Sequence, residues 1–196
     1  MRLSNLTKNS DNFFSRLKEL YNEMSDTYNR LVNLYGLDCK GCKDNCCQTR
    51  FHNHTYVEYF YLMEGIAALP EDRNKELMDR AFGVCNQIDE ADARGETPRI
   101  MCPLNEKGLC VLYEYRPMVC RLHGVPYDMA LPGRPSTRGD GCSIFQDDFQ
   151  DKAYIAFDRT PLYRSLSLLE RDLRMETGRS DRVNLTVAQM MTFDLQ

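Results

Sequence analysis

The chain has 196 residues, a length that suits one domain with a hydrophobic core of its own. Hydrophobic residues make up 42% and charged residues 28%, which is the balance of a globular protein and excludes a disordered or fibrous one. A net charge of −4 gives no general attraction to nucleic acid, and no stretch approaches the ~18 apolar residues of a membrane-spanning helix. The first residues also lack the apolar core of a secretory signal. We therefore expect a cytoplasmic protein that binds neither nucleic acid nor membrane.

Residues 12–34 carry the pattern of a long amphipathic helix. Apolar side chains recur every three or four positions, and aromatic side chains recur every seven positions in a second stripe. Gly36 follows and is suited to a left-handed cap at the end of the helix. The first stripe consists of Phe13, Leu17, Leu20, Met24, Leu31 and Leu34, and the second of Phe14, Tyr21, Tyr28 and Tyr35. We expect this helix to pack within the domain.

The next stretch, LDCKGCKDNCCQTR at residues 37–50, holds Cys39, Cys42, Cys46 and Cys47 within nine positions. Thiols stay reduced in the cytoplasm, so this density indicates metal or redox chemistry rather than disulfides. Two cysteines separated by two residues can meet one metal, as Cys39 and Cys42 could. The adjacent side chains of Cys46 and Cys47 diverge. We therefore expect this pair to serve two metal centres, or two irons of one cluster.

Two helices follow the cysteine loop. Thr55 with Glu58 three residues later fits a capping box at the start of a helix over 55–69, and Pro70 ends that helix. A second helix is expected over 71–93. Cys85 lies on its apolar face without another cysteine nearby in sequence, so we interpret it as a small hydrophobic residue of the core.

The segment 97–145 is rich in glycine and proline and shows no helical period. So long an irregular segment within a compact domain needs something other than a core to organise it. The segment holds the other four cysteines: Cys102, Cys110, Cys120 and Cys142. The alternation of Tyr113 and Tyr115 fits a short strand. Helices are expected again after Thr160-Pro161 and after Thr186.

The predicted fold class is therefore mainly α: a single helical domain with an irregular, cysteine-rich metal-binding segment. Its parts are a long N-terminal helix within 1–37, a cysteine-cluster core over 39–142, and C-terminal helices within 143–196.

Eight cysteines suffice for two metal sites, because four thiolates complete one tetrahedral zinc or one four-iron cluster. The predicted metal ligands are Cys39, Cys42, Cys46, Cys47, Cys102, Cys110, Cys120 and Cys142. Zinc and iron–sulfur both suit thiolates, so the metal stays open. Cations lower thiol pKa and offset thiolate charge, and five are interleaved with the cysteines: Lys40, Lys43, Arg50, Arg116 and Arg121. His123 is a further candidate, as a ligand or as a hydrogen-bond donor to sulfur.

The residues also resemble a known family. The four-cysteine loop and CPLNEKGLCVLYEYRPMVCRLHG are similar to the YkgJ-type cysteine-cluster family, described as zinc- or iron-chelating proteins. The matching elements are Cys102-Pro103, Gly108-Leu109-Cys110, Tyr113-Glu114-Tyr115-Arg116-Pro117 and Cys120-Arg121. The first motif departs from the family's usual C-x2-C-x2-C-C, because three residues separate Cys42 from Cys46. The resemblance covers roughly residues 39–142 and implies metal binding; the family includes a flagellin lysine N-methylase branch.

Three functions stay open. The first is a metal-binding protein whose zinc or iron–sulfur centre has a structural or redox role. The second is a protein-modifying enzyme related to flagellin lysine N-methylase. The third is a helical module that binds an unknown protein partner and uses metal only for structure. No catalytic residue is identifiable, and a complete cysteine set leaves no open position of the kind that catalytic zinc requires. The first function is therefore favoured.

Overall fold

The computed structural model describes residues 3–5, 7–38, 42, 45–130, 132–149 and 151–193. The fold is mainly helical, with 57% helix and 7% strand, as the sequence predicts. The described helices are α1 (Ser10–Tyr35), α2 (Tyr56–Ala67), α3 (Glu71–Ala93), α4 (Met118–Arg121), α5 (Ser143–Phe149), α6 (Thr160–Thr177) and α7 (Val187–Thr192), with 3-10 turns η1 (Leu3–Asn5), η2 (Cys46–Gln48) and η3 (Tyr113–Tyr115). Across the described residues, none of the helices combines the length and the apolar character needed to cross a membrane.

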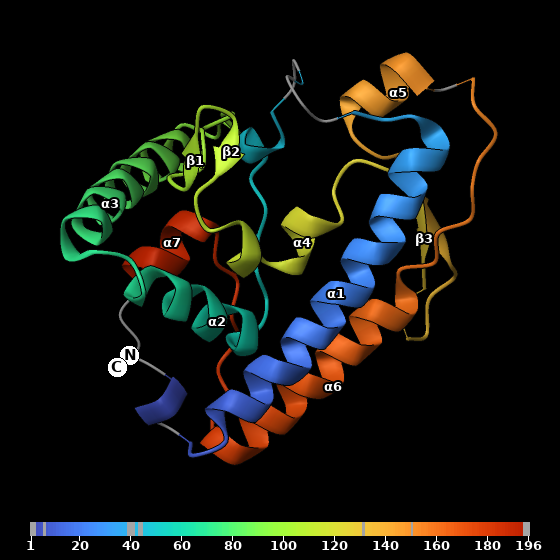
Figure 1. Ribbon diagram of the computed structural model, residues 1–196. Helices are drawn as coiled ribbons and strands as arrows, with labels where there is room; N and C mark the ends of the chain where they lie inside the picture. The colour runs from blue at the N-terminus through green and yellow to red at the C-terminus, as the bar shows by residue number, and fades with distance from the viewer. Residues whose placement is uncertain are drawn as a thin grey trace.

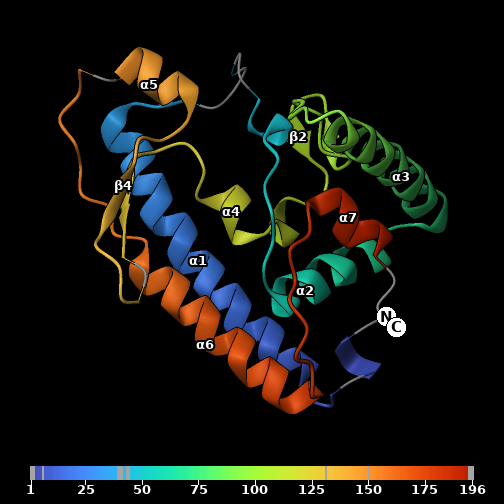
Figure 2. The same ribbon diagram turned by 180° about the vertical axis from the view of Figure 1, so that it is seen from behind.

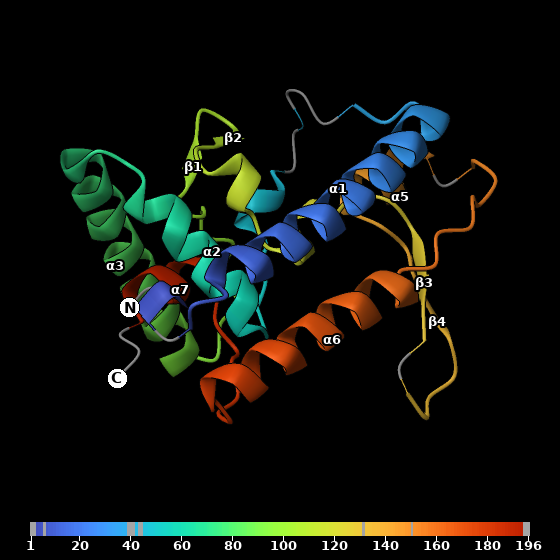
Figure 3. The ribbon, with the colours of Figure 1, turned by 60° about the horizontal axis from the view of Figure 1, so that its bottom comes forward.

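The helices α1 and α6 run side by side in opposite directions (Figures 1 and 3). Both predicted stripes of α1 contribute to the core, apart from one residue. Leu34, which the pattern assigned to the buried face, is 66% exposed, because the last turn instead buries Tyr35. Gly36 ends the helix as predicted, with φ 71° and hydrogen bonds from Gly36 N–H to Asn33 and from Leu37 N–H to Val32.

The central helix of the molecule is α2, which contacts α1, α6 and α7. Nine of its twelve residues are buried, so it is covered on nearly all sides. α3 keeps the predicted bounds and packs against α7 (Figure 2). Thr186 begins α7 with a full capping box, in which its hydroxyl accepts from Gln189 N–H and the Gln189 side chain accepts from Thr186 N–H.

The start of α2 differs from the expected capping box. The Thr55 hydroxyl donates to the Glu58 carboxylate at 2.7 Å rather than capping a backbone N–H. The N–H of Val57, which has no partner within the helix, is instead capped by the Glu170 carboxylate of α6, at 3.0 Å. A carboxylate from another helix satisfies the helix start, because the negative charge also suits the positive end of the helix.

The irregular middle segment contains two small antiparallel hairpins. β1 (Asn105–Glu106) pairs with β2 (Leu109–Cys110), and β3 (Tyr127–Met129) pairs with β4 (Thr137–Gly139). The expected strand at Tyr113 and Tyr115 is wrong, because these residues form η3. The Tyr115 ring packs over Gly65 in α2 and lies 4.8 Å from the Tyr61 ring. Contact with the central helix, rather than pairing with a strand, decides the local conformation.

The contact between Gly65 and Tyr115 gives a first prediction. Gly65→Ala should lower the free energy of unfolding by about 1–2 kcal/mol although alanine is the better helix former, because the added Cβ would overlap the tyrosine ring. An ideal Cβ at Gly65 lies 2.5 Å from Tyr115 Cγ. Gly83→Ala in α3 is the matched control: its Cβ meets no described atom within 4 Å, so stability should rise by about 0.5–1 kcal/mol. Urea denaturation measures both, and equal effects would contradict the packing argument.

Candidate functional site

Cysteines from three separate segments border one pocket, with a cavity of about 80 Å³. Cys46 and Cys47 lie in η2 and Cys120 lies in α4. Cys102 lies just before β1, and Cys110 is the last residue of β2. The volume is several times what one water molecule needs. The structure thus brings five of the eight predicted ligands to one place.

Apolar side chains and two arginines complete the wall of this pocket. Val84 and Ile88 of α3 and Val187 and Ala188 of α7 form one side. Arg50 and Arg116 lie at the same pocket, and Arg50 is bound at its rim by the Asp92 carboxylate at 2.5 and 2.6 Å. An apolar wall lowers the local dielectric, so charges on the sulfur atoms interact strongly there.

Backbone contacts position the thiols. The Cys102 N–H donates to the Cys47 carbonyl at 2.9 Å, which joins the first cysteine loop to the second segment. Cys110 lies opposite Asn105 in the β1–β2 pair. The turn between these strands places Lys107 at φ 50° and Gly108 at φ 88°, conformations that favour glycine and that make the hairpin tight.

The pKa values of the pocket thiols differ sharply. Burial, with the nearby charges of Cys47 and Cys110, raises the pKa of Cys102 to about 12. Burial also raises the pKa of Cys110 and of Cys120. For Cys47 the pKa falls to about 6, chiefly through a hydrogen bond from the Cys46 side chain, with smaller help from Asn105 and Arg116 against the effect of burial. Neighbouring groups therefore shift the pKa of each of these four thiols, and of the four only Cys47 ionises near neutral pH.

Two arginines supply positive charge to the thiols. Arg116 lowers the pKa of Cys47, Cys110 and Cys120. Arg121 is only 7% exposed, and its guanidinium lies 3.9 Å from the centre of the Tyr21 ring. Its hydrogen bonds in the described chain go to neutral carbonyls, those of Arg116 at 2.8 Å and Glu114. A buried cation held by neutral groups favours negative charge nearby, and Arg121 lowers the pKa of Cys110.

Asn105 adds a buried donor at the same place. Its side chain is 8% exposed, and its Nδ2 reaches no hydrogen-bond acceptor among the described residues. The amide nevertheless lies close enough to Cys47 to lower the thiol's pKa. A buried amide without a full partner is costly, so this donor suits an additional acceptor at the sulfur atoms. Sequence reasoning missed Asn105 because it reads as an ordinary turn residue before Lys107-Gly108.

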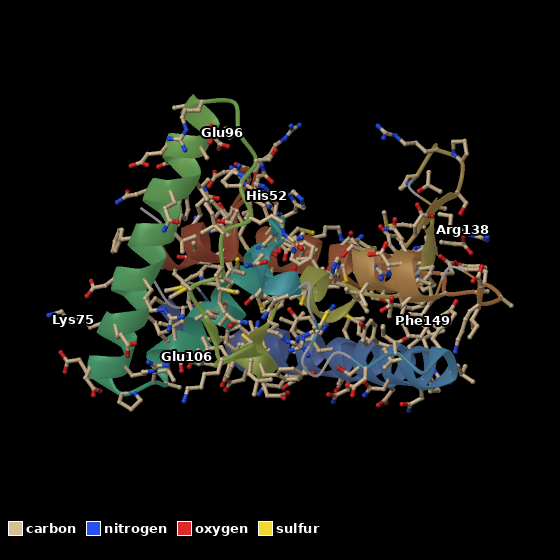
Figure 4. The ribbon with its side chains drawn as sticks, turned by 90° about the horizontal axis from the view of Figure 1, so that it is seen from above. His52, Lys75, Glu96, Glu106, Arg138 and Phe149 are labelled. Carbon is tan, nitrogen blue, oxygen red and sulfur yellow. The ribbon has the colours of Figure 1, made fainter. Side chains whose placement is uncertain are left out.

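Of the other three predicted ligands, the two that the structure describes do not line this pocket. Cys39 is outside the described residues, and Cys42 is half-buried and does not line the pocket. Cys142 precedes α5, where its sulfur accepts the Phe145 N–H at 3.4 Å. The helix α3 contributes one wall of the pocket. Figure 4 shows Lys75 of this helix at the opposite end of the molecule from Phe149 of α5.

Two further side chains that the sequence singled out, His123 and Cys85, do not line the pocket. His123 does not line the pocket; its ring packs edge-on against Phe51, with the ring centres 5.0 Å apart. Cys85 is also separate from the pocket thiols, and its sulfur lies 3.4 Å from the Thr192 hydroxyl of α7. Cys85 is therefore apart from the pocket cysteines, but it is only partly buried and contacts a hydroxyl, so it does not take the place in the hydrophobic core that the sequence suggested.

No three His, Cys, Asp or Glu side chains of the described residues are arranged, as they stand, to hold a metal ion. Comparison of the chain with protein-family models, with curated proteins and with solved structures found no match. The resemblance to the YkgJ-type family therefore rests on the quoted motifs alone, and the function has to be argued from the site.

The low pKa of Cys47 gives a second prediction. In chelated protein, iodoacetamide should modify Cys47 faster than Cys102, Cys110 and Cys120 at pH 7, and the rate at Cys47 should fall to about half at pH 6. Cys102 is the internal control and should stay unreactive, because its pKa is about 12. Site-resolved mass spectrometry measures both rates, and similar rates at the two cysteines would contradict the assignment.

The same pKa has a consequence for stability. The folded pKa of Cys47 lies below its usual value near 9, so the thiolate favours the folded state. This contribution is complete above the unfolded pKa and is lost as the pH falls through about 6.

Proposed function

We propose that the protein binds metal through cysteine thiolates, as zinc or as an iron–sulfur cluster, in a structural or redox role. One centre would use Cys47, Cys102, Cys110 and Cys120. The observation that carries this proposal is that these four thiols, from three segments of the chain, border one cavity and affect each other's pKa.

The chemistry of the pocket fits such a group. A metal ion deprotonates the thiols that coordinate it, and this reverses the raised pKa of Cys102 and Cys120. Four thiolates around Zn²⁺ or an oxidised four-iron cluster leave about two net negative charges, which Arg116 and Arg121 would offset. Asn105 would donate its free N–H to a sulfur atom. The fully thiolate ligand set leaves no open position, which favours structure or electron transfer over hydrolysis.

A second centre would use the remaining predicted ligands: Cys39, Cys42, Cys46 and Cys142. Contacts around Gly124 support it. The Cys142 N–H donates to the Gly124 carbonyl at 2.9 Å, and a Cβ built at Gly124 would lie 3.8 Å from the Leu37 side chain. The first cysteine loop thus begins beside the residue that holds Cys142. Cys46 is exposed, whereas its neighbour Cys47 is half-buried at the first centre. We further propose that the chain is a member of the YkgJ-type family, in which metal binding is the common property.

Metal analysis gives the third prediction. Wild-type protein purified anaerobically should contain stoichiometric metal, and Cys120→Ser should lose the metal of the first centre because one thiolate is missing. Cys85→Ser is the matched control and should keep the full metal content. Broad visible absorbance with bound sulfide would identify iron–sulfur, and a colourless protein with zinc would identify the other metal. Wild-type protein without metal would refute the proposed function.

The vicinal pair gives the fourth prediction. Cys46→Ser should remove about half of the metal if Cys46 and Cys47 serve separate centres, because one centre loses a ligand while the other keeps its four. Measurement of metal per chain, with Cys85→Ser as reference, checks it. Complete retention of metal, or a wild-type chain with one ion, would contradict the arrangement in two centres.

A further inference from the structure

A buried carboxylate links the helical core to the short helix that carries Cys120. Glu58 of α2 is 4% exposed, and its Oε1 accepts the Tyr21 hydroxyl at 2.8 Å and the Met118 N–H at 2.6 Å. Its Oε2 accepts the Thr55 hydroxyl at 2.7 Å. Burial raises the pKa of Glu58, and these hydrogen bonds act in the opposite direction. One side chain thus joins α1, α2 and the first residue of α4.

The helix α4 needs such support. It has four residues, Met118–Arg121, and so few residues do not hold a helix without external contacts. The Met118 N–H is at the helix start, where no intrahelical acceptor exists, and Glu58 fills that place. Figures 1 and 2 show α4 near the centre of the molecule, beside α1.

The other end of α4 meets the same group of side chains. Arg121, its last residue, stacks on the ring of Tyr21, whose hydroxyl holds Glu58. Arg121 also donates to the carbonyls of Arg116 and Glu114, in the turn before α4. Cys120 therefore sits between two anchors, Glu58 at the start of α4 and Arg121 at its end, and Tyr21 contacts both.

We propose that Glu58, held by Tyr21, is a positioning residue that fixes the Cys120 thiol at the first metal centre. The proposal rests on the proposed function, because it takes Cys120 as a ligand. Loss of the Glu58 carboxylate frees the start of α4 and lets Cys120 leave the pocket, without removing any ligand.

Glu170 provides a matched control. It is 7% exposed and caps the same end of α2 through Val57 N–H, and it pairs with Arg174 at 2.6 Å. Both carboxylates are buried and both stabilise α2, but Glu58 alone has a hydrogen bond to α4 within the described chain. A general loss of stability should appear in both variants, whereas loss of positioning should appear only at Glu58.

The experiment measures alkylation of Cys120 relative to Cys85 by N-ethylmaleimide in chelated full-length protein, with site-resolved mass spectrometry. Glu58→Ala should raise the ratio about tenfold, the effect expected from one lost hydrogen bond to a charged group. Glu170→Ala should change it less than about twofold. Glu58→Gln keeps an acceptor oxygen for the Met118 N–H and should restore most of the wild-type ratio. Equal rises for Glu58→Ala and Glu170→Ala, or no rise, would overturn the proposal.

A second variant covers the case in which Glu58→Ala does not fold. Tyr21→Phe removes the hydroxyl that holds Glu58 but keeps the ring under Arg121, and it should raise the same ratio about threefold or more. An unchanged ratio would overturn the proposal. The metal content of the wild type is measured in parallel: a wild type without metal refutes the proposed function, whereas a loaded wild type with unchanged Cys120 reactivity in the variants refutes positioning alone.

Discussion

The physical constraint at the centre of this structure is the placing of four partly buried thiols, with the exposed Cys46 beside them, around one small, mainly apolar cavity. Each negative charge there makes the next one harder to form, so burial and neighbouring sulfur atoms raise the pKa of Cys102 and Cys120. Only Cys47 is shifted the other way. Without a cation the four thiols cannot all ionise at neutral pH, and a positive group among them removes the conflict. In the proposed function, a bound cation would supply this positive charge.

The residues around the thiols also affect the balance of charge in the pocket. Arg116 and Arg121 bring positive charge, and the buried amide of Asn105 brings a donor with no complete partner of its own. Arg121 and Asn105 are both buried, and a buried cation and an amide without a full partner both cost free energy. Their costs fall together when negative sulfur atoms are present. This shared dependence is a stronger argument for a thiolate centre than the number of cysteines.

The sequence predicts the long helices well and the tertiary polar contacts poorly. α3 was predicted with its bounds, because a proline precedes it and its apolar positions recur with a helical period. Leu34 was misassigned, and Tyr113 and Tyr115 form a turn instead of a strand, because packing against α2 decides their conformation. These are cases in which contacts between distant segments override local pattern.

For the candidate site, too, the sequence indicates the residue types but not their contacts across the fold. Eight cysteines could be selected from spacing and composition, and Cys85 could be set apart by its place on a helix face. Which thiols meet could not be predicted, since Cys47 and Cys120 are 73 positions apart and the chain between them folds back through two helices and a hairpin. Asn105 and Glu58 were missed for the same reason, because each gains its role only from a partner in another segment.

The residue before the vicinal cysteines holds their turn in place. Asn45, which directly precedes the vicinal pair, caps η2: its side chain accepts the Cys47 N–H at 3.0 Å and its carbonyl accepts the Gln48 N–H at 2.9 Å. The cap fixes the turn in which Cys47 is half-buried and Cys46 exposed, while both border the pocket. Asn45 therefore precedes two adjacent thiols of different exposure, and the hydrogen bond between their side chains is the most direct link between the two proposed centres.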